Sequence, residues 1–134
     1  MELSQCHQTI INLIESWKIQ ELCEQYFAAE FIWEVKGSSQ LSKTYTSKQD
    51  YYKQALYRLQ KHLQPKASIK LIHSYSCGNT LIVELEGNMT TLSGQQYNNQ
   101  YCWVIKTQDN LITSITAYLD TLLLEKILSD EKNQ

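Results

Sequence analysis

Apolar side chains recur every three or four residues in three segments of the chain. The first two segments predict amphipathic helices over residues 3–17 and 19–27, each with one apolar face. A third helix is predicted to begin after Ser47, because a serine followed three residues later by Asp50 resembles a helix-capping arrangement. Pro65 closes this helix, since proline cannot continue its backbone hydrogen bonding. The N-terminal half of the chain is therefore predicted to be mainly helical.

Beyond the proline the hydrophobic period changes to two. Alternation of apolar and polar residues predicts four strands: 67–75, 80–90, 95–107 and 111–119. The short polar segments between these runs demand an antiparallel meander. Earlier in the chain, the aromatic and β-branched stretch 31–35 predicts a further strand, whereas the polar residues 36–47 predict a loop. A short helix over residues 121–129 is expected to follow the last strand.

This order of elements is typical of an α+β fold in a single domain, residues 1–134. We expect three N-terminal helices packed on a strongly curved, mainly antiparallel sheet, followed by the short C-terminal helix. Such a sheet wrapped around helices would form a cone-shaped barrel with an apolar pocket at one mouth.

Charge and composition exclude several classes of function. The formal net charge is −2, from 12 basic and 14 acidic residues, and Arg58 is the single arginine. This balance disfavours binding to nucleic acid or to an anionic membrane. The sequence has no basic leader and no apolar run near the ~20 residues of a membrane span, so a cytoplasmic location is expected. The four cysteines are far apart, so we expect reduced thiols, no metal site and no cofactor.

Two stretches resemble a known group of proteins. "FAAEFIWEVKGSS" (27–39) and "YCWVIKTQDNLITSITAYLDT" (101–121) resemble the SnoaL-like and ketosteroid-isomerase-like proteins of the nuclear-transport-factor-2-like superfamily. The resemblance extends over nearly the whole chain. It implies a cone-shaped α+β barrel, a homodimer formed through the sheet, and a pocket between sheet and helices. The group contains cyclases, isomerases and epoxide hydrolases as well as proteins without known chemistry, so the fold does not decide the function.

The departures from the group narrow the chemistry that the resemblance implies. The position of the ketosteroid isomerase base is matched here by Val35, and no Asp or Glu occurs from residue 87 to 108. The epoxide hydrolases need an inner-strand arginine, whereas Arg58 belongs to the predicted third helix. The arrangement that survives is that of the polyketide cyclases, in which one acidic residue transfers a proton. The matching residue here is Asp120.

Asp120 has two interpretations. As the residue before the last helix it is a favoured N-cap, whose carboxylate accepts backbone N–H bonds. As a catalyst it would turn into the pocket and carry a raised pKa. The residue types alone favour the cap and the resemblance favours the catalyst, so both remain open.

Several other side chains are candidates for the site. His73 is predicted to share a strand face with Ile69, Leu71 and Tyr75, and it is the best second titrating group, as a catalytic helper to Asp120. Five aromatic residues are candidates for the pocket wall: Trp33, Tyr57, Tyr101, Trp103 and Tyr118.

Two functions are compatible with these observations. The first is a cofactor-independent cyclase or isomerase that uses one carboxylate on an apolar carbonyl substrate. The second is a non-catalytic module of the same fold that binds a ligand or a protein. In either case the expected partners are a small apolar or aromatic ligand and a second copy of the chain.

Overall fold

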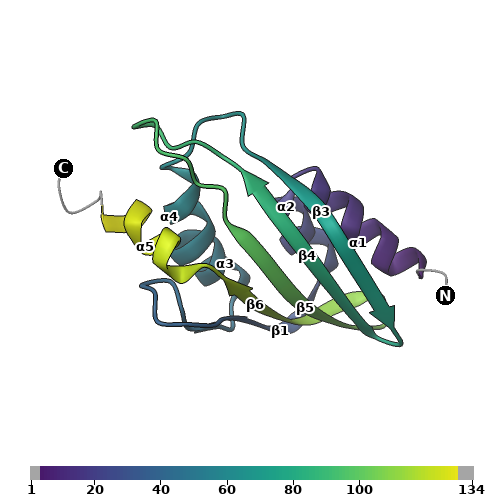
Figure 1. Ribbon diagram of the computed structural model, residues 1–134. Helices are drawn as coiled ribbons and strands as arrows, with labels where there is room; N and C mark the ends of the chain where they lie inside the picture. The colour runs from purple at the N-terminus through teal and green to yellow at the C-terminus, as the bar shows by residue number, and fades with distance from the viewer. Residues whose placement is uncertain (1–3, 130–134) are drawn as a thin grey trace.

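The computed structural model describes residues 4–129, which form an α+β fold (Figure 1). The elements follow the order α1 (Gln5–Glu15), α2 (Ile19–Tyr26), β1 (Phe27–Val35), β2 (Thr44–Tyr45), α3 (Lys48–Tyr51), η1 (Tyr52–Leu56), α4 (Tyr57–Gln60), β3 (Ser68–Cys77), β4 (Thr80–Asn88), β5 (Gln100–Gln108), β6 (Leu111–Leu119) and α5 (Thr121–Ser129). The expected helices and main strands are all present, although their ends differ by a few residues.

The sheet is mixed, with strand order β2-β1-β6-β5-β4-β3. Strands β3 to β6 form the expected antiparallel meander. Strand β1 pairs with β6 in parallel, and the long connection that this pairing requires contains β2, the third helix and the strands β3 to β5. The last strand of the chain therefore lies inside the sheet, between β1 and β5.

A short strand lies within the segment 36–47 that was expected to be a loop. Thr44 and Tyr45 pair with Glu34 and Trp33 of β1. The Tyr45 side chain is buried, and its hydroxyl donates to the carbonyl of Leu41 at 2.8 Å. Tertiary burial of one tyrosine thus makes a strand of two residues in a polar segment that lacks a strand pattern.

The third helix runs from Lys48 to Gln60 without a break, and its middle part, η1, is π-helical. The Ser47 hydroxyl accepts from the N–H of Asp50 at 3.4 Å, as the capping pattern predicts. The π segment adds a residue to one turn, so that Ala55 and Leu56 both turn inward and are buried. Both side chains lie over the sheet.

The two faces of the sheet have different surroundings. Residues on one face are buried beneath the helices, and Figure 1 shows α1 to α4 behind the long strands. On the opposite face four large side chains are exposed: Ile32, Ile72, Tyr75 and Tyr118. No helix among residues 4–129 is long and apolar enough to cross a membrane.

Candidate functional site

An apolar cavity of about 60 Å³ lies between the covered face of the sheet and the third helix. Its lining comes from β1, β5, β6, the helices and the loop before β2: Trp17, Ile19, Trp33, Val35, Leu41, Tyr51, Ala55, Leu56, Leu59, Tyr101, Trp103, Ala117, Leu119 and Leu124. The small side chain of Ala117 lies on β6 between Val35 of β1 and Trp103 of β5. A larger residue at this position would occupy the space that the lining encloses.

Aromatic rings form much of the cavity wall. The rings of Trp33 and Tyr51 stack, with centroids 3.9 Å apart and an interplanar angle of 16°. Trp103 meets Trp33 edge-on at 5.3 Å and Tyr101 edge-on at 6.1 Å. Offset and edge-to-face pairs of this kind hold the rings in defined orientations. Aromatic rings in defined orientations therefore make up much of this apolar wall.

Two buried hydrogen-bond donors in this wall have no partner. They are the indole Nε1 of Trp33 and the hydroxyl of Tyr101, the former in a side chain that is 1 % exposed and the latter in one that is 9 % exposed. Burial raises the pKa of Tyr101 well above its usual value, and the adjacent Tyr97 hydroxyl adds to the rise although the two hydroxyls are not at hydrogen-bond geometry. Burial likewise raises the pKa of Tyr51. Both tyrosines therefore remain protonated at neutral pH.

Trp17 reaches the cavity from a strained backbone position. The N–H groups of Trp17 and Lys18 donate to the carbonyls of Ile14 and Leu13, each at 2.9 Å, which is a Schellman motif at the end of α1. Glycine usually occupies the left-handed position of this motif, but here Trp17 does, with φ of 56°. A bulky residue in this conformation costs about 1–2 kcal/mol. The strain lies in a residue that lines the cavity.

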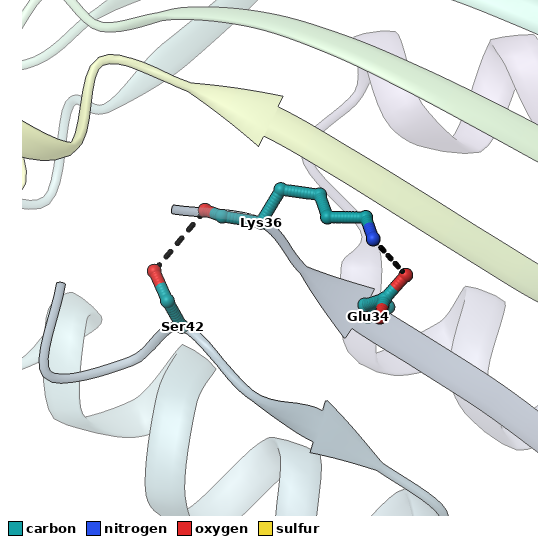
Figure 2. Close-up of polar contacts among 3 residues, drawn as sticks. All are labelled: Glu34, Lys36 and Ser42. Carbon is teal, nitrogen blue, oxygen red and sulfur yellow. Dashed lines mark hydrogen bonds and ion pairs between the residues drawn. The ribbon is translucent and has the colours of Figure 1, made fainter. Parts of the chain in front are cut away.

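The loop after β1 closes over one side of the cavity. The Ser42 hydroxyl donates to the carbonyl of Lys36 at 3.1 Å, and the Lys36 ammonium lies 2.9 Å from the Glu34 carboxylate (Figure 2). The Ser39 N–H donates to the Ser42 hydroxyl at 3.1 Å. The two bonds of Ser42 lie within this loop, in which Leu41 is 5 % exposed and lines the cavity.

Polar contacts fasten the same loop to two helices. The Gln40 backbone and side-chain N–H groups donate to the Glu125 carboxylate of α5, and Arg58 of α4 donates to the Gln40 side-chain oxygen at 2.6 Å. Gly37 approaches α5 so closely that an added Cβ would lie 2.7 Å from the Thr121 methyl carbon. Because φ of Gly37 is also 107°, glycine is the residue that fits here.

Asp120 lies at the start of α5 and is exposed. Its Oδ1 accepts from the N–H of Leu123 at 3.1 Å, which is the geometry of a helix N-cap. The buried amide of Asn99 holds the Asp120 backbone from the other side, accepting from its N–H at 2.9 Å and donating to its carbonyl at 3.0 Å. Asp120 is not among the residues that line the cavity.

His73 lies on the open face of the sheet. The register between β3 and β4 shifts after Leu71, so that Leu71 faces Leu85 whereas His73 faces Glu84. This β-bulge turns His73 to the opposite side, so the expectation that it shares a face with Leu71 and Ile69 is wrong. Its Nδ1 is 3.5 Å from Glu84 Oε2, and its side chain is 63 % exposed. Asp120 and His73 therefore do not meet in the cavity.

The aromatic candidates divide between the two faces of the sheet. Trp33, Tyr101 and Trp103 line the cavity together. Tyr57 is 54 % exposed on α4. Tyr118 is exposed on the open face, where it borders a groove with Cys102 and Ile72. Alternation along β6 separates Tyr118 from the inward-facing residues, as the period of two requires.

This chain is similar to known proteins in its three-dimensional structure rather than in its sequence. No protein-family model matches the chain, and no curated protein matches its sequence. A nuclear-transport-factor-2-like protein from Burkholderia thailandensis superimposes with a TM-score of 0.76 at 16 % identity, over 94 % of this chain and 98 % of that chain. One from Burkholderia pseudomallei gives a TM-score of 0.77 at 13 % identity, over 95 % and 99 %. The chain has the nuclear-transport-factor-2-like fold.

A further protein with this fold carries the name of an enzyme. A Mesorhizobium loti protein named as a SnoaL-like polyketide cyclase superimposes with a TM-score of 0.71 at 13 % identity, over 88 % of this chain and 99 % of that chain. The superpositions show the nuclear-transport-factor-2-like fold, and at identities this low they show no activity.

Two aromatic residues of the cavity wall, Trp17 and Tyr51, are not among the pocket residues expected from the sequence. Tyr51 lies on the third helix, and its stacking on Trp33 depends on how that helix crosses β1. Trp17 was expected to end the first helix, whereas the helix ends at Glu15. A tryptophan in place of the usual glycine gives no sequence signal for a Schellman motif.

The described lining of the cavity contains few ionisable groups. Among the described lining residues there is no carboxylate, amine or imidazole, and the ionisable groups are the hydroxyls of Tyr51 and Tyr101. Within residues 4–129, no three His, Cys, Asp or Glu side chains are placed to hold a metal ion.

Proposed function

We propose that this protein binds a small, uncharged, apolar or aromatic molecule in the cavity and performs no proton transfer through Asp120. The observation that carries this proposal is the aromatic cavity itself, whose described lining has no acid or base apart from two tyrosines with raised pKa values. A group that exchanges protons near neutral pH needs a pKa near 7. Burial raises the pKa of both tyrosines further from that value.

The positions of the two expected catalytic residues support binding over catalysis. The Asp120 carboxylate is exposed and engaged with the N–H of Leu123. His73 is on the opposite face of the sheet. A catalytic role would require Asp120 to leave its helix and enter the cavity, at the cost of its capping bond.

The size of the cavity limits the ligand. A cavity of about 150 Å³ is known to bind benzene, and drug-sized pockets measure about 300–1,000 Å³. The 60 Å³ present here is smaller than either. We therefore expect the ligand to be small, about one ring, and its entry to displace part of the wall. The strained Trp17 and the loop carrying Leu41 are the segments that would move.

The proposal is tested by filling the cavity. We expect Ala117→Val, which adds two methyl groups to the cavity wall, to weaken binding of one-ring aromatic fragments at least tenfold in a thermal-shift and NMR screen. Thr116→Val is the matched control, since Thr116 is the neighbouring residue on the opposite face of β6 and valine has nearly the same shape. Equal binding by the wild type and a folded Ala117→Val protein would show that the cavity is not the binding site.

A further inference from the structure

The lining of the cavity reaches the surface of the protein at few places. Most of the lining side chains are buried, and three of them are partly exposed: Trp17, Val35 and Leu119. A molecule that enters the cavity must pass a side chain that contacts both the cavity and the solvent, or must displace a buried part of the wall. The three partly exposed residues and the loop that carries Leu41 are therefore the places where an entrance could lie.

The sheet holds two of these residues in position. The N–H of Val35 donates to the carbonyl of Lys43 at 3.0 Å, and Val35 is the partner of Ala117 in β6. Leu119 is the partner of Tyr101 in β5. A strand end that moves away from its neighbours loses such hydrogen bonds, which opposes opening at Val35 or at Leu119.

Polar contacts hold the loop that carries Leu41. The Gln40 backbone and side-chain N–H groups donate to the Glu125 carboxylate, and Arg58 donates to the Gln40 side-chain oxygen. Leu41 itself is 5 % exposed. Opening here would break several of these contacts together, because the loop is bound to two helices at once.

Trp17 lies under a different constraint. It is in the connection between α1 and α2, and the two hydrogen bonds of its Schellman motif are made by backbone atoms. The indole ring can therefore rotate about its side-chain torsions without breaking them. A positive φ in a bulky residue is a true outlier, and strained residues of this kind cluster at ligand clamps and switch regions. Glycine would fit this backbone, but it would leave this part of the cavity wall without a side chain.

We propose that the indole ring of Trp17 is the gate of the cavity, which turns aside to admit the ligand and then closes behind it. This inference rests on the proposed function and adds how access to the same site is controlled. A gate sets the rates at which a ligand enters and leaves, whereas the affinity depends on the contacts made inside the cavity.

Benzene, a single uncharged ring, is a suitable probe of the gate. Its association and dissociation rate constants are measured by NMR exchange in the wild type and in Trp17→Gly. We expect both rate constants to rise about tenfold or more in Trp17→Gly, and the Kd to change by less than about threefold. The loss of a wall contact alone would raise only the dissociation rate constant.

Two further substitutions separate the ring from the backbone of Trp17. Trp17→Ala removes the ring but keeps a Cβ at the positive φ, so it should exchange benzene as fast as Trp17→Gly and have a Tm lower by about 3 °C or more. Trp17→Phe keeps a smaller ring and should give intermediate rates, which provides a test even if the glycine variant does not fold. Fast exchange in Trp17→Gly but not in Trp17→Ala would overturn the gate, because the effect would then belong to the backbone.

The other possible entrances have their own variants. Leu119→Ala shortens a partly exposed lining residue on β6, and Glu125→Ala loosens the loop that carries Leu41. We expect neither substitution to raise the association rate constant more than about twofold. An acceleration in either variant as large as that in Trp17→Gly would place the entrance elsewhere and overturn the inference.

The outcomes distinguish the gate from the function on which it rests. Benzene binding to the wild type with rate constants that are unchanged in Trp17→Gly would overturn the gate and leave the binding function standing. Failure of benzene to bind both the wild type and a folded Trp17→Gly protein at millimolar concentration would overturn the binding function together with the gate.

Discussion

The N-cap at Asp120 allows a sharp test of how this residue contributes to the protein. Asp120 Oδ1 accepts one backbone N–H bond, from Leu123, and α5 buries Leu124, Ile127 and Leu128 to 1 % exposure or less. Replacing Asp120 by alanine removes the bond without altering the buried face of the helix. We expect the free energy of unfolding to fall by about 1 kcal/mol, the usual effect of losing a cap.

This loss is large enough to measure. For a domain of this size, 1 kcal/mol corresponds to a fall in Tm of about 3–5 °C. Thermal unfolding and urea titration of wild type and Asp120→Ala would give the difference, with an unchanged urea m-value as the sign that both unfold from the same folded state.

Asp120→Asn is the matched control, because asparagine caps helices about as well as aspartate but carries no charge. We expect it to keep most of the wild-type stability. An Asp120→Ala protein with the wild-type Tm would refute the capping argument. An Asp120→Asn protein that is stable but loses turnover of an identified substrate would show that the carboxylate is catalytic after all.

Three further predictions concern other parts of the molecule. Asn99→Ala, which leaves the N–H and carbonyl of Asp120 without their buried partner, should lower the free energy of unfolding by about 2–4 kcal/mol in urea titration; a loss below 0.5 kcal/mol would contradict this account. Burial lowers the pKa of His7, so the unfolded chain takes up the proton first, and stability should fall as the pH drops below about 6.5. His7→Gln should flatten this dependence between pH 7.5 and 5.5, and an equally steep dependence in the variant would assign it to other groups. The expected homodimer through the open face of the sheet remains a prediction, which Ile72→Lys should disrupt in size-exclusion light scattering, while Tyr57→Lys on a helix should not.

Patterns along the chain determine most of the secondary structure. A period of three to four residues marks the helices, and a period of two marks the meander, because only those spacings place apolar side chains on one face of each element. Of the five aromatic residues expected in the pocket wall, Trp33, Tyr101 and Trp103 line the cavity, whereas Tyr57 and Tyr118 are exposed outside it. Local chemistry also identified Ser47 as a cap and Asp120 as a residue suited to one.

Tertiary contacts decided the remainder. One extra residue in β3 turns the His73 side chain to the open face of the sheet. Such a bulge leaves no signal in the sequence, because the alternation of apolar and polar residues is intact on either side of it. The burial of Tyr45 made a strand from a polar segment, and the unusual backbone of Trp17 brought an aromatic ring to the cavity.

The sequence by itself determined the order of elements, the class of fold and the candidate aromatic residues. The tertiary structure decided which of those residues share a cavity and that the Asp120 carboxylate contacts its own helix. The physical reason is range: periodicity and capping depend on neighbours within four residues, whereas the cavity brings together side chains from β1, β5, β6 and the third helix.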